Sequence, residues 1–462
     1  MLKQFLGDRA FYRRVIAVAL PIIIQNAITN FVSMLDNIMV GQVGTIPMSG
    51  VSIVNQLLFV FNLCVFGATS GAGIFTAQFF GSDDQDGIRH TFRFKFLVAL
   101  VLGAAGIGLF SVAGSDLIRL YLRGEGTPED LVQTLVHGLD YLKVMLWGLV
   151  PFALANAYSG TLRECGQTSV PMVAGVIAVL VNLCLNYVLI FGKFGAPAMG
   201  VRGAALATVI SRYVELAIVA IWVHLHPEKN SYIRGVYRSM RIPRSLLKGI
   251  FLRGMPLLIN EALWASGMAI MNQCYSVRGL DVVAALNIST TLWNLASVMF
   301  LSVGNAVGII MGQILGAGTD RETVKSTNKK LIFTSVVSCL GFSLLLALLA
   351  DVFPNIYKTT DAVRHIATQV ILVGAVMMPF NAYTHATYFT LRSGGQTFVT
   401  FLFDSCFVWC ICVPVAYLLS RFTAIPIVPL YILCHTPELL KCILGTYMLK
   451  KGSWIQNLTE KT

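Results

Sequence analysis

Charged side chains are scarce in this chain of 462 residues. Asp, Glu, Lys and Arg together make up 12% of it, whereas 56% of the residues are hydrophobic and the mean hydropathy is +0.72. A soluble domain carries about 25% charged residues, so this chain has too few of them to cover a surface exposed to water. We therefore expect most of its outer surface to face lipid.

Closely spaced cysteines are missing as well. The chain has ten cysteines, but no two are spaced as Cys-x-x-Cys, and nearly all lie in apolar stretches. Structural zinc sites and redox motifs need thiols at such spacings. Cysteines in apolar surroundings behave as small buried hydrophobes, so we expect neither a metal cluster nor a disulfide framework.

Motifs of hydrolytic enzymes are also absent. The sequence has no His-Glu-x-x-His and no Gly-x-Ser-x-Gly, and its seven histidines are scattered. We therefore expect no enzyme and no cofactor. The formal charge of +12 does not indicate nucleic-acid binding, because the basic residues lie mostly in alternate loops, as the positive-inside rule predicts for a membrane protein.

Long apolar stretches are what the sequence does contain. They are continuous and reach the roughly 20 residues that cross a bilayer as a helix, so helices rather than barrel strands are predicted. We expect an all-α integral membrane protein with twelve spans at 13–40, 50–80, 94–114, 132–160, 168–191, 201–225, 251–276, 283–315, 331–351, 364–390, 397–420 and 426–449. The division predicted is an N-lobe (1–225, helices 1–6), a cytoplasmic linker (226–248) and a C-lobe (249–462, helices 7–12).

The distribution of basic residues indicates the orientation. Lys and Arg concentrate in the linker and in the loops on the same side of the membrane as the N-terminus. We therefore expect a multi-pass protein of the plasma membrane with both termini in the cytoplasm. The basic cluster of the linker either binds anionic lipid or serves as a topology signal on a solvated connection.

The two sets of six spans repeat each other. Shifting residues 21–95 by 235 positions brings Pro21 onto Pro256, Gly44 onto Gly279 and Gln78 onto Gln313 without a gap, and TLRECGQT (161–168) returns as TLRSGGQT (390–397). Six helices return the chain to its starting side, so the halves are parallel repeats. A doubled bundle offers an interface at which access can alternate, which is typical of transporters.

Asp36 is the first candidate functional residue, because an ionisable group at membrane depth is costly. It lies in the first predicted span and has no cationic residue three or four positions away. Such a carboxylate can carry a proton or bind a cation. The alternatives are a salt bridge to another helix and a position that faces water.

Two amides and a hydroxyl are candidates to join Asp36. Asn182 and Asn186 lie four residues apart, so they share one face of the fifth predicted span, and Thr208 lies in the sixth. Together with Asp36 they could form an oxygen-rich pocket of the kind that hard cations occupy. Alternatively, the amides only hold helices together through hydrogen bonds.

Other acidic residues divide into two groups. Glu261 in the seventh span has no cation nearby in the sequence, and we consider a cation or substrate contact for it. Asp404 in the eleventh span is also unpaired locally and lies nearer the cytoplasmic end, and it is a further functional candidate. Acids with a base three residues away are expected to form structural pairs; these pairs are Asp140 with Lys143, Arg212 with Glu215, and Glu438 with Lys441.

The segment LPIIIQNAITNFVSMLDNIMVGQVG (20–44), with Pro21 and, fifteen residues later, Asp36, resembles the first helix of the multidrug and toxic compound extrusion (MATE) family. The two octapeptides, the asparagine pair and GVRGAALATVISR (200–212) are similar to further patterns of that family, and the resemblance covers essentially the whole chain. It implies an antiporter whose two six-helix lobes enclose a V-shaped central cavity. Such proteins export drugs or metabolites, often cationic and lipophilic, in exchange for protons or sodium ions.

The resemblance also implies site residues. A proton or Na⁺ would be taken up at Asp36, Asn182, Asn186 and Thr208, and the first helix would bend near a hinge at Pro21. This chain departs from the family at Asn186, where other members carry Asp. In the second half, Trp264 and Asn381 stand where some members carry acids, with Glu261 one turn before Trp264. Fewer acids favour proton over sodium coupling, and they leave Glu261, Trp264 and Asn381 as candidates for a polar site or substrate contact.

We expect a monomer that exchanges a small-molecule substrate for H⁺ or Na⁺ across the lipid bilayer, without nucleic acid as a partner. The first alternative is a lipid-linked saccharide flippase of related architecture. Such a protein needs a strongly cationic cavity, and intramembrane Arg and Lys are few here. A passive channel is the second alternative, but the short filter-like repeats expected of one are missing.

Overall fold

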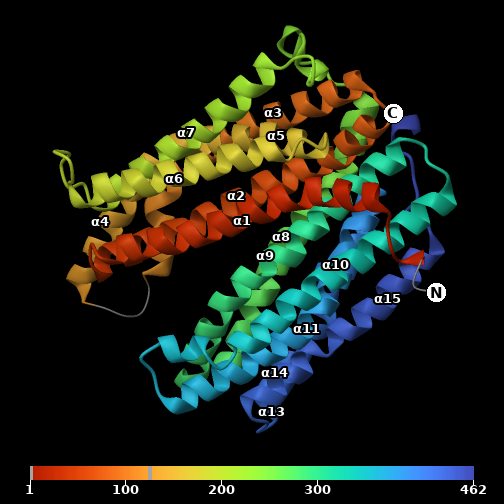
Figure 1. Ribbon diagram of the computed structural model, residues 1–462. Coiled ribbons are helices and arrows are strands. Elements are labelled where there is room, and N and C mark those ends of the chain that lie inside the picture. Colours follow the sequence, from red (N-terminus) through yellow and green to blue (C-terminus); the bar gives the residue numbers. More distant parts are fainter. Residues whose placement is uncertain (1–3, 123–126, 462) are drawn as a thin grey trace. The chain divides into compact units, whose positions relative to one another are not determined.

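The structure is a computed structural model that describes residues 4–122 and 127–461. Within these residues it consists of helices and connecting turns, with no β-strand (Figure 1). The helices of the first half are α1 (Arg9–Gly41), α2 (Thr45–Gly81), α3 (Gln85–Tyr121), α4 (Pro128–Met145), α5 (Leu149–Glu164), α6 (Ser169–Phe191) and α7 (Val201–Leu225).

The second half repeats the order of the spans, but its helices are interrupted at different places. They are α8 (Arg244–Ser276), α9 (Leu280–Gly316), α10 (Arg321–Leu349), α11 (Asp361–Ser393), α12 (Thr397–Phe401), α13 (Val413–Phe422), α14 (Ile427–His435) and α15 (Pro437–Lys451). Two π-helical segments, Leu402–Cys406 and Val408–Cys412, connect α12 to α13. One 3₁₀ turn, Leu146–Gly148, connects α4 to α5.

Each of the twelve predicted spans coincides with helical structure. In the described part of the chain, eleven helical stretches are long and apolar enough to cross a membrane. The predicted span outside this set corresponds to α8, which has 33 residues and carries charged residues at Arg244, Lys248, Arg253 and Glu261. The predicted span 426–449 is interrupted at Pro437, which starts a new helix because proline cannot donate a helical hydrogen bond. The all-α membrane fold class is therefore confirmed.

The repeated sequence folds alike in both halves. Gly44 before α2 has a φ of +134°, and Gly279 before α9, its counterpart in the repeat, has a φ of +118°. Only glycine adopts such angles without strain. The sharp turn between the first and second helix of each half therefore depends on this pair of glycines.

The chain divides into two compact units. One comprises Ile24–Thr76 and Asp84–Lys248; the other comprises the described chain up to Ile23, Ala77–Asp83 and the chain from Gly249 onward. In the first unit α6 and α7 run side by side (Figure 1). The start of α1 and the end of α2 thus group with the second half of the sequence. The predicted division into an N-lobe, linker and C-lobe does not include this grouping of parts of α1 and α2 with the second half. That division stays a prediction.

The end of α2 contacts the end of α9 closely within the second of these units. A Cβ atom added to Gly81 would collide with the backbone carbonyl of Gln313, and one added to Gly316 would collide with that of Gln78. The four residues are two pairs of repeat counterparts. Small residues allow two helix backbones to approach in this way, so these glycines are required by packing.

The repeated octapeptides hold the chain segments that follow each half. Gln167 of TLRECGQT donates from Nε2 to the carbonyl oxygen of Lys229 at 3.3 Å and to Oδ1 of Asn230 at 3.2 Å. Gln396 of TLRSGGQT donates from Nε2 to the carbonyl oxygen of Ser453 at 3.2 Å. The same glutamine therefore binds the segment after the last helix of each half, which gives the repeat of this motif a structural reason.

The predicted linker is folded onto α3. Arg93 donates from Nε to the carbonyl oxygen of Val236 at 2.8 Å and from Nη2 to that of Gly235 at 3.2 Å, and Arg89 donates to that of Tyr232 at 3.0 Å. The side chains of Tyr232 and Val236 are buried. The linker is therefore an ordered part of the first unit rather than a solvated connection.

Candidate functional site

Asp36, Asn182, Asn186 and Thr208 come together within one compact unit. α1 carries Asp36, α6 carries both asparagines and α7 carries Thr208. Nδ2 of Asn186 donates to Oδ1 of Asp36 at 2.8 Å. Asn182 and Asn186 are only 6% and 2% exposed. The structure thus places the four predicted residues in a single cluster, in which the asparagines are buried and Asp36 and Thr208 are half-buried. Their role in ion binding stays a prediction.

The orientation of the Asn182 amide follows from its neighbours, because oxygen and nitrogen of an amide are assigned by hydrogen bonding. With its nitrogen toward Asp36, it donates to Oδ2 at 2.7 Å and to Oδ1 at 3.1 Å, and its oxygen accepts from Oγ1 of Thr208 at 3.2 Å. Asp36 then receives N–H groups from both asparagines. These neutral dipoles can hold its negative charge without a cation.

No basic side chain forms an ion pair with Asp36 among the described residues. One buried acceptor in the cluster, Oδ1 of Asn186, also has no hydrogen-bond partner. A buried polar atom without a partner needs an explanation. A proton on Asp36 or a cation beside it would supply what this oxygen lacks.

The cluster fits a proton more readily than a sodium ion. A hard cation needs several oxygen ligands. Here the oxygens of Asp36 already accept amide N–H groups, and that of Asn182 accepts from Thr208. Sodium would use Asp36, Asn186 and Thr208 only after the amides had turned, whereas a proton binds to Asp36 itself and needs no set of oxygen ligands.

Tyr141 on α4 belongs to the same neighbourhood, although it is not among the residues predicted from the sequence. It is 5% exposed, its hydroxyl donates to Oδ1 of Asn55 on α2 at 3.2 Å, and it interacts electrostatically with Asp36. A signal was present in the sequence, since Tyr141 lies on a stripe with Thr134, Gly138 and Met145 that is buried along α4. A buried tyrosine hydroxyl usually requires a polar partner.

The second half does not show a comparable cluster of predicted residues. Trp264 on α8 is 42% exposed, and Asn381 on α11 donates to the carbonyl oxygen of Met377 in its own helix at 3.0 Å. Glu261 on α8 interacts electrostatically with Arg392 and Asp404. No hydrogen bond between described residues joins Glu261, Trp264 and Asn381, so a shared site for them stays a prediction.

Asp404 is paired, although the sequence near it contains no cation. Nζ of Lys441 on α15 lies 3.3 Å from its Oδ1, and Nδ2 of Asn260 donates to its Oδ2 at 3.1 Å. Lys441 also contacts Glu438 at 3.4 Å. Asp404 lies in a π-helical turn, and such turns often occur at functional positions. The ion pair with Lys441 nevertheless indicates a structural role for this acid.

The predicted local pairs have mixed outcomes. The pair of Glu438 and Lys441 is confirmed. Asp140 pairs with Arg202 on α7 at 2.9 Å instead of Lys143. Arg212 donates to the carbonyl oxygen of Gly148 at 3.3 Å, although Glu215 acts on it electrostatically. Asp140 and Arg212 thus contact groups distant in the sequence instead of the partners three residues away. Sequence spacing cannot show such contacts.

Comparison with known proteins places these features in a family. The MatE family model matches residues 21–188 and 256–418, and so covers most of both halves. The chain belongs to the multidrug and toxic compound extrusion (MATE) family. It is 24% identical over 443 residues to a probable multidrug resistance protein NorM of Thermotoga maritima, which covers 96% of this chain and 93% of that protein. It is 26% identical over 429 residues to the multidrug resistance protein PmpM of Pseudomonas aeruginosa (91% and 86% covered).

Solved structures show the same fold. A multidrug resistance MATE family transporter in an outward-facing conformation has a TM-score of 0.86 at 19% identity, covering 100% of this chain and 99% of that one. A MATE structure in the straight conformation gives the same TM-score, identity and coverage. This likeness establishes the MATE fold for the chain.

Membership in the family decides several of the predictions. MATE proteins are transporters, so this chain is a multi-pass membrane transporter of small molecules and not an enzyme. The relatives named above carry multidrug resistance names, and they give no support to the alternative of a lipid-linked saccharide flippase.

Proposed function

We propose that this transporter is a secondary antiporter that exports drugs or metabolites, above all cationic lipophilic compounds, in exchange for protons. It works as a monomer in the plasma membrane, with both termini in the cytoplasm, and needs no cofactor because an ion gradient drives it. The observation that carries this proposal is an acid inside a membrane helix whose described polar partners are neutral amides. A group held in this way can change its charge during a cycle.

Protonation of Asp36 changes its hydrogen bonding. The carboxylate accepts N–H groups from Asn182 and Asn186, whereas a protonated carboxyl must also donate one hydrogen bond. Oδ1 of Asn186, which has no partner, is on the amide that already contacts Asp36. Uptake of a proton therefore rearranges the contact between α1 and α6, and the rearrangement is the step that links the ion to the helix.

Pro21 is the proposed hinge that passes this change along α1. Proline inside a helix removes one backbone hydrogen bond and favours bending at that point. Within α1, the residues up to Ile23, which lies two residues after Pro21, belong to the second unit. The residues of α1 from Ile24 onward belong to the first unit. A bend at Pro21 would therefore fall close to the boundary between the two units.

Sodium coupling is the second candidate, because Asp36, Asn186 and Thr208 can offer oxygen ligands once the amides turn. Coupling by either ion requires that the ion and the substrate favour different states or compete for one site. The two candidates differ in which gradient drives export, and this can be measured directly.

The decisive experiment measures ethidium efflux from inverted vesicles with the proton and sodium gradients varied independently. The wild type should pump with a proton gradient alone. Asp36→Asn should lower gradient-driven efflux by about tenfold or more, because coupling between the two bound species is lost. Asp116→Asn, at an exposed acid near the end of α3, is the matched control and should pump normally. If Asp36→Asn pumps at the wild-type rate, the mechanism is wrong.

A further inference from the structure

Positive charge concentrates on the linker between α7 and α8. Residues 226–248 contain six Lys and Arg but only one Glu and no Asp. Four arginines with exposed side chains form what we name the basic face of the linker: Arg234, Arg238, Arg241 and Arg244. Among the described residues no acid forms an ion pair with any of them. The protein itself therefore leaves the charges of this face without a counter-charge.

The contacts that hold the linker on α3 do not use the basic face. Arg89 and Arg93 of α3 donate to backbone carbonyls of the linker, and the side chain of Tyr232 is buried. The segment after the second half, residues 452–461, is bound by the counterpart glutamine Gln396, yet it has one Lys, one Glu and no Arg. Packing of such a segment against its half therefore does not require a basic face.

The linker lies at the depth of the lipid headgroups. The predicted span within α3 begins at residue 94, and Arg93 binds the carbonyl oxygens of Gly235 and Val236. Arg89, which also binds the linker, lies about 8 Å before the start of the span, since a helix rises 1.5 Å per residue. The polar layer on each side of a bilayer is about 5–8 Å thick. Both anchor points of the linker on α3 therefore lie within this layer.

The basic face is interspersed with exposed apolar side chains. Tyr237 and Met240, on either side of Arg238 in the sequence, are 45% and 38% exposed. The hydroxyl of Tyr237 is hydrogen-bonded to that of Tyr158 on α5, and its ring stacks on His224 of α7 with the centroids 5.9 Å apart. Tyrosine is enriched at membrane interfaces because its ring is apolar and its hydroxyl is polar. These contacts also hold the backbone beside Arg238 in place before any ligand binds.

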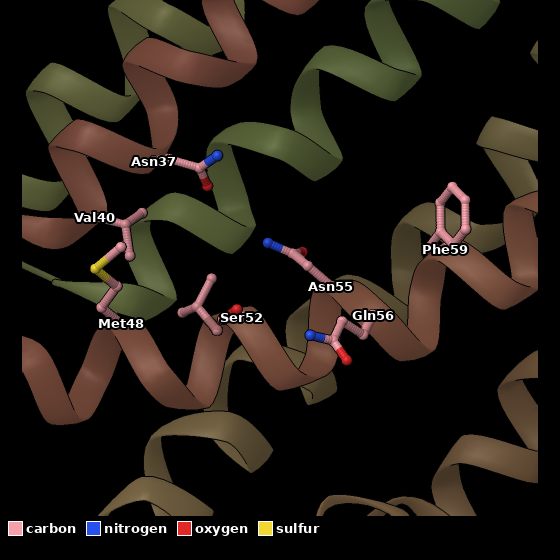
Figure 2. Close-up of a pocket in the computed structure, with 8 residues that line it drawn as sticks. Asn37, Val40, Met48, Ser52, Asn55, Gln56 and Phe59 are labelled. Carbon is pink, nitrogen blue, oxygen red and sulfur yellow. The ribbon is translucent and has the colours of Figure 1, made fainter. Parts of the chain in front are cut away.

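The cavity of about 450 Å³ between α1 and α2 in the same unit lacks the charge that an anion needs. Its lining residues, which include Asn37, Ser52 and Asn55, are all uncharged (Figure 2). A guanidinium group, by contrast, forms two parallel charge-assisted hydrogen bonds to a phosphate. A phosphate group therefore favours the basic face of the linker over this cavity.

We propose that the basic face of the linker is a binding site for the phosphate groups of anionic phospholipids. The guanidinium groups of Arg238 and Arg241 donate to phosphate oxygens. Arg234 and Arg244 add attraction to the negative membrane surface, and Met240 contacts the apolar part of the lipid. The site concerns lipid rather than substrate or coupling ion, so it goes beyond the export function and does not depend on it. A topology signal acts only during insertion, whereas this site persists in the folded protein.

Hydrogen exchange of the wild-type protein tests the site. The full-length chain is placed in nanodiscs of phosphatidylcholine, with and without added phosphatidylglycerol, at one ionic strength. A ligand that binds the docked linker and not its opened form slows exchange, and phosphatidylglycerol should slow exchange over residues 234–244 about threefold or more. Residues 452–461 are the internal control, and their exchange should change less than about 1.5-fold.

Two variants with the same loss of charge locate the effect. One removes three charges of the basic face: Arg234→Gln, Arg238→Gln and Arg241→Gln. The other removes three exposed cations of α10 and α15: Lys329→Gln, Lys450→Gln and Lys451→Gln. The first variant should abolish the difference between the two lipid compositions, and the second should keep it. The comparison of lipids with the wild type needs neither variant to fold.

Three outcomes would leave the arginines as a topology signal only and overturn the proposal. They are equal exchange of residues 234–244 in both lipids, an equal slowing of residues 452–461, and a difference that survives in the arginine variant. Inorganic phosphate, added to the protein in phosphatidylcholine nanodiscs, should not slow exchange. A slowing as large as that by phosphatidylglycerol would assign the site to free phosphate and also overturn the proposal. The experiment uses no gradient and no substrate, so its result is independent of the antiport test at Asp36.

Discussion

Asp36 and Asp404 are both acids within membrane helices, yet their surroundings differ. Asp36 accepts hydrogen bonds from two neutral asparagines, whereas Asp404 has the ammonium group of Lys441 at 3.3 Å. The ammonium group neutralises the charge of Asp404, whereas amide N–H groups solvate the carboxylate of Asp36 without neutralising it. The difference supports the proposal that the first half carries the exchangeable charge, while the ion pair of Asp404 holds helices together in the second half.

The largest expected effect is on stability, at Lys441. This residue is 5% exposed and contacts both Asp404 and Glu438. Lys441→Met would leave two acids without their cation, and removing one member of a buried pair costs about 3 kcal/mol or more. The melting temperature in detergent should fall by several degrees, whereas Asp36→Asn should change it little.

Removing the charges together separates this effect from a packing defect. Combining Lys441→Met with Asp404→Asn and Glu438→Gln should recover most of the melting temperature, because no unpaired charge remains. A triple variant as unstable as Lys441→Met would show that the lysine acts through its packing, and the contrast between the two acids would lose its basis.

A smaller effect, on ion selectivity, is expected at Asn186. The amide nitrogen of Asn186 lies 2.8 Å from Oδ1 of Asp36. Asn186→Asp would therefore place a second carboxyl beside Asp36. Two adjacent carboxylates favour a shared proton or a bound cation. A sodium gradient should then stimulate ethidium efflux about fivefold more than in the wild type, a typical coupling effect. Asn186→Leu is the control without charge, and a sodium response in that variant would contradict the explanation.

The smallest effect concerns a third kind of acid, which is stabilised by backbone N–H groups outside the spans. Asp320 precedes α10, and its carboxylate accepts from the backbone nitrogen of Thr323 at 2.9 Å. This hydrogen bond lowers the pKa of Asp320. A lowered pKa in the folded state means that the stabilisation is present at neutral pH and is lost as the pH falls through the folded-state pKa.

Asp320→Ala should therefore lower the melting temperature slightly at pH 7 and not at all once the carboxyl is protonated at low pH. Asp281→Ala, at an exposed acid in the first turn of α9, is the control. A difference that persists at low pH would mean that the side chain contributes through something other than its charge.

The features that follow from hydropathy and short spacing were predictable. The spans and the grouping of Asn182 with Asn186 depend on residues close in sequence, and the repeat is found by aligning the two halves of the sequence. Contacts between distant helices were not predictable from spacing, as Tyr141 with Asn55 and Asp404 with Lys441 demonstrate. The π-helical turn that carries Asp404 has no signal in apolar periodicity, and it changes which face a residue occupies.

The docking of residues 226–243 on α3 has a practical consequence for dividing this protein into two separately encoded fragments. Arg89 and Arg93 bind backbone carbonyls of this segment, and its aromatic anchor Tyr232 is buried. A break at residue 226 would strip these arginines of their acceptors and uncover apolar surface on the first fragment. A break near Pro243 keeps the segment with the helices it covers, so fragment complementation should succeed there and fail at the earlier position.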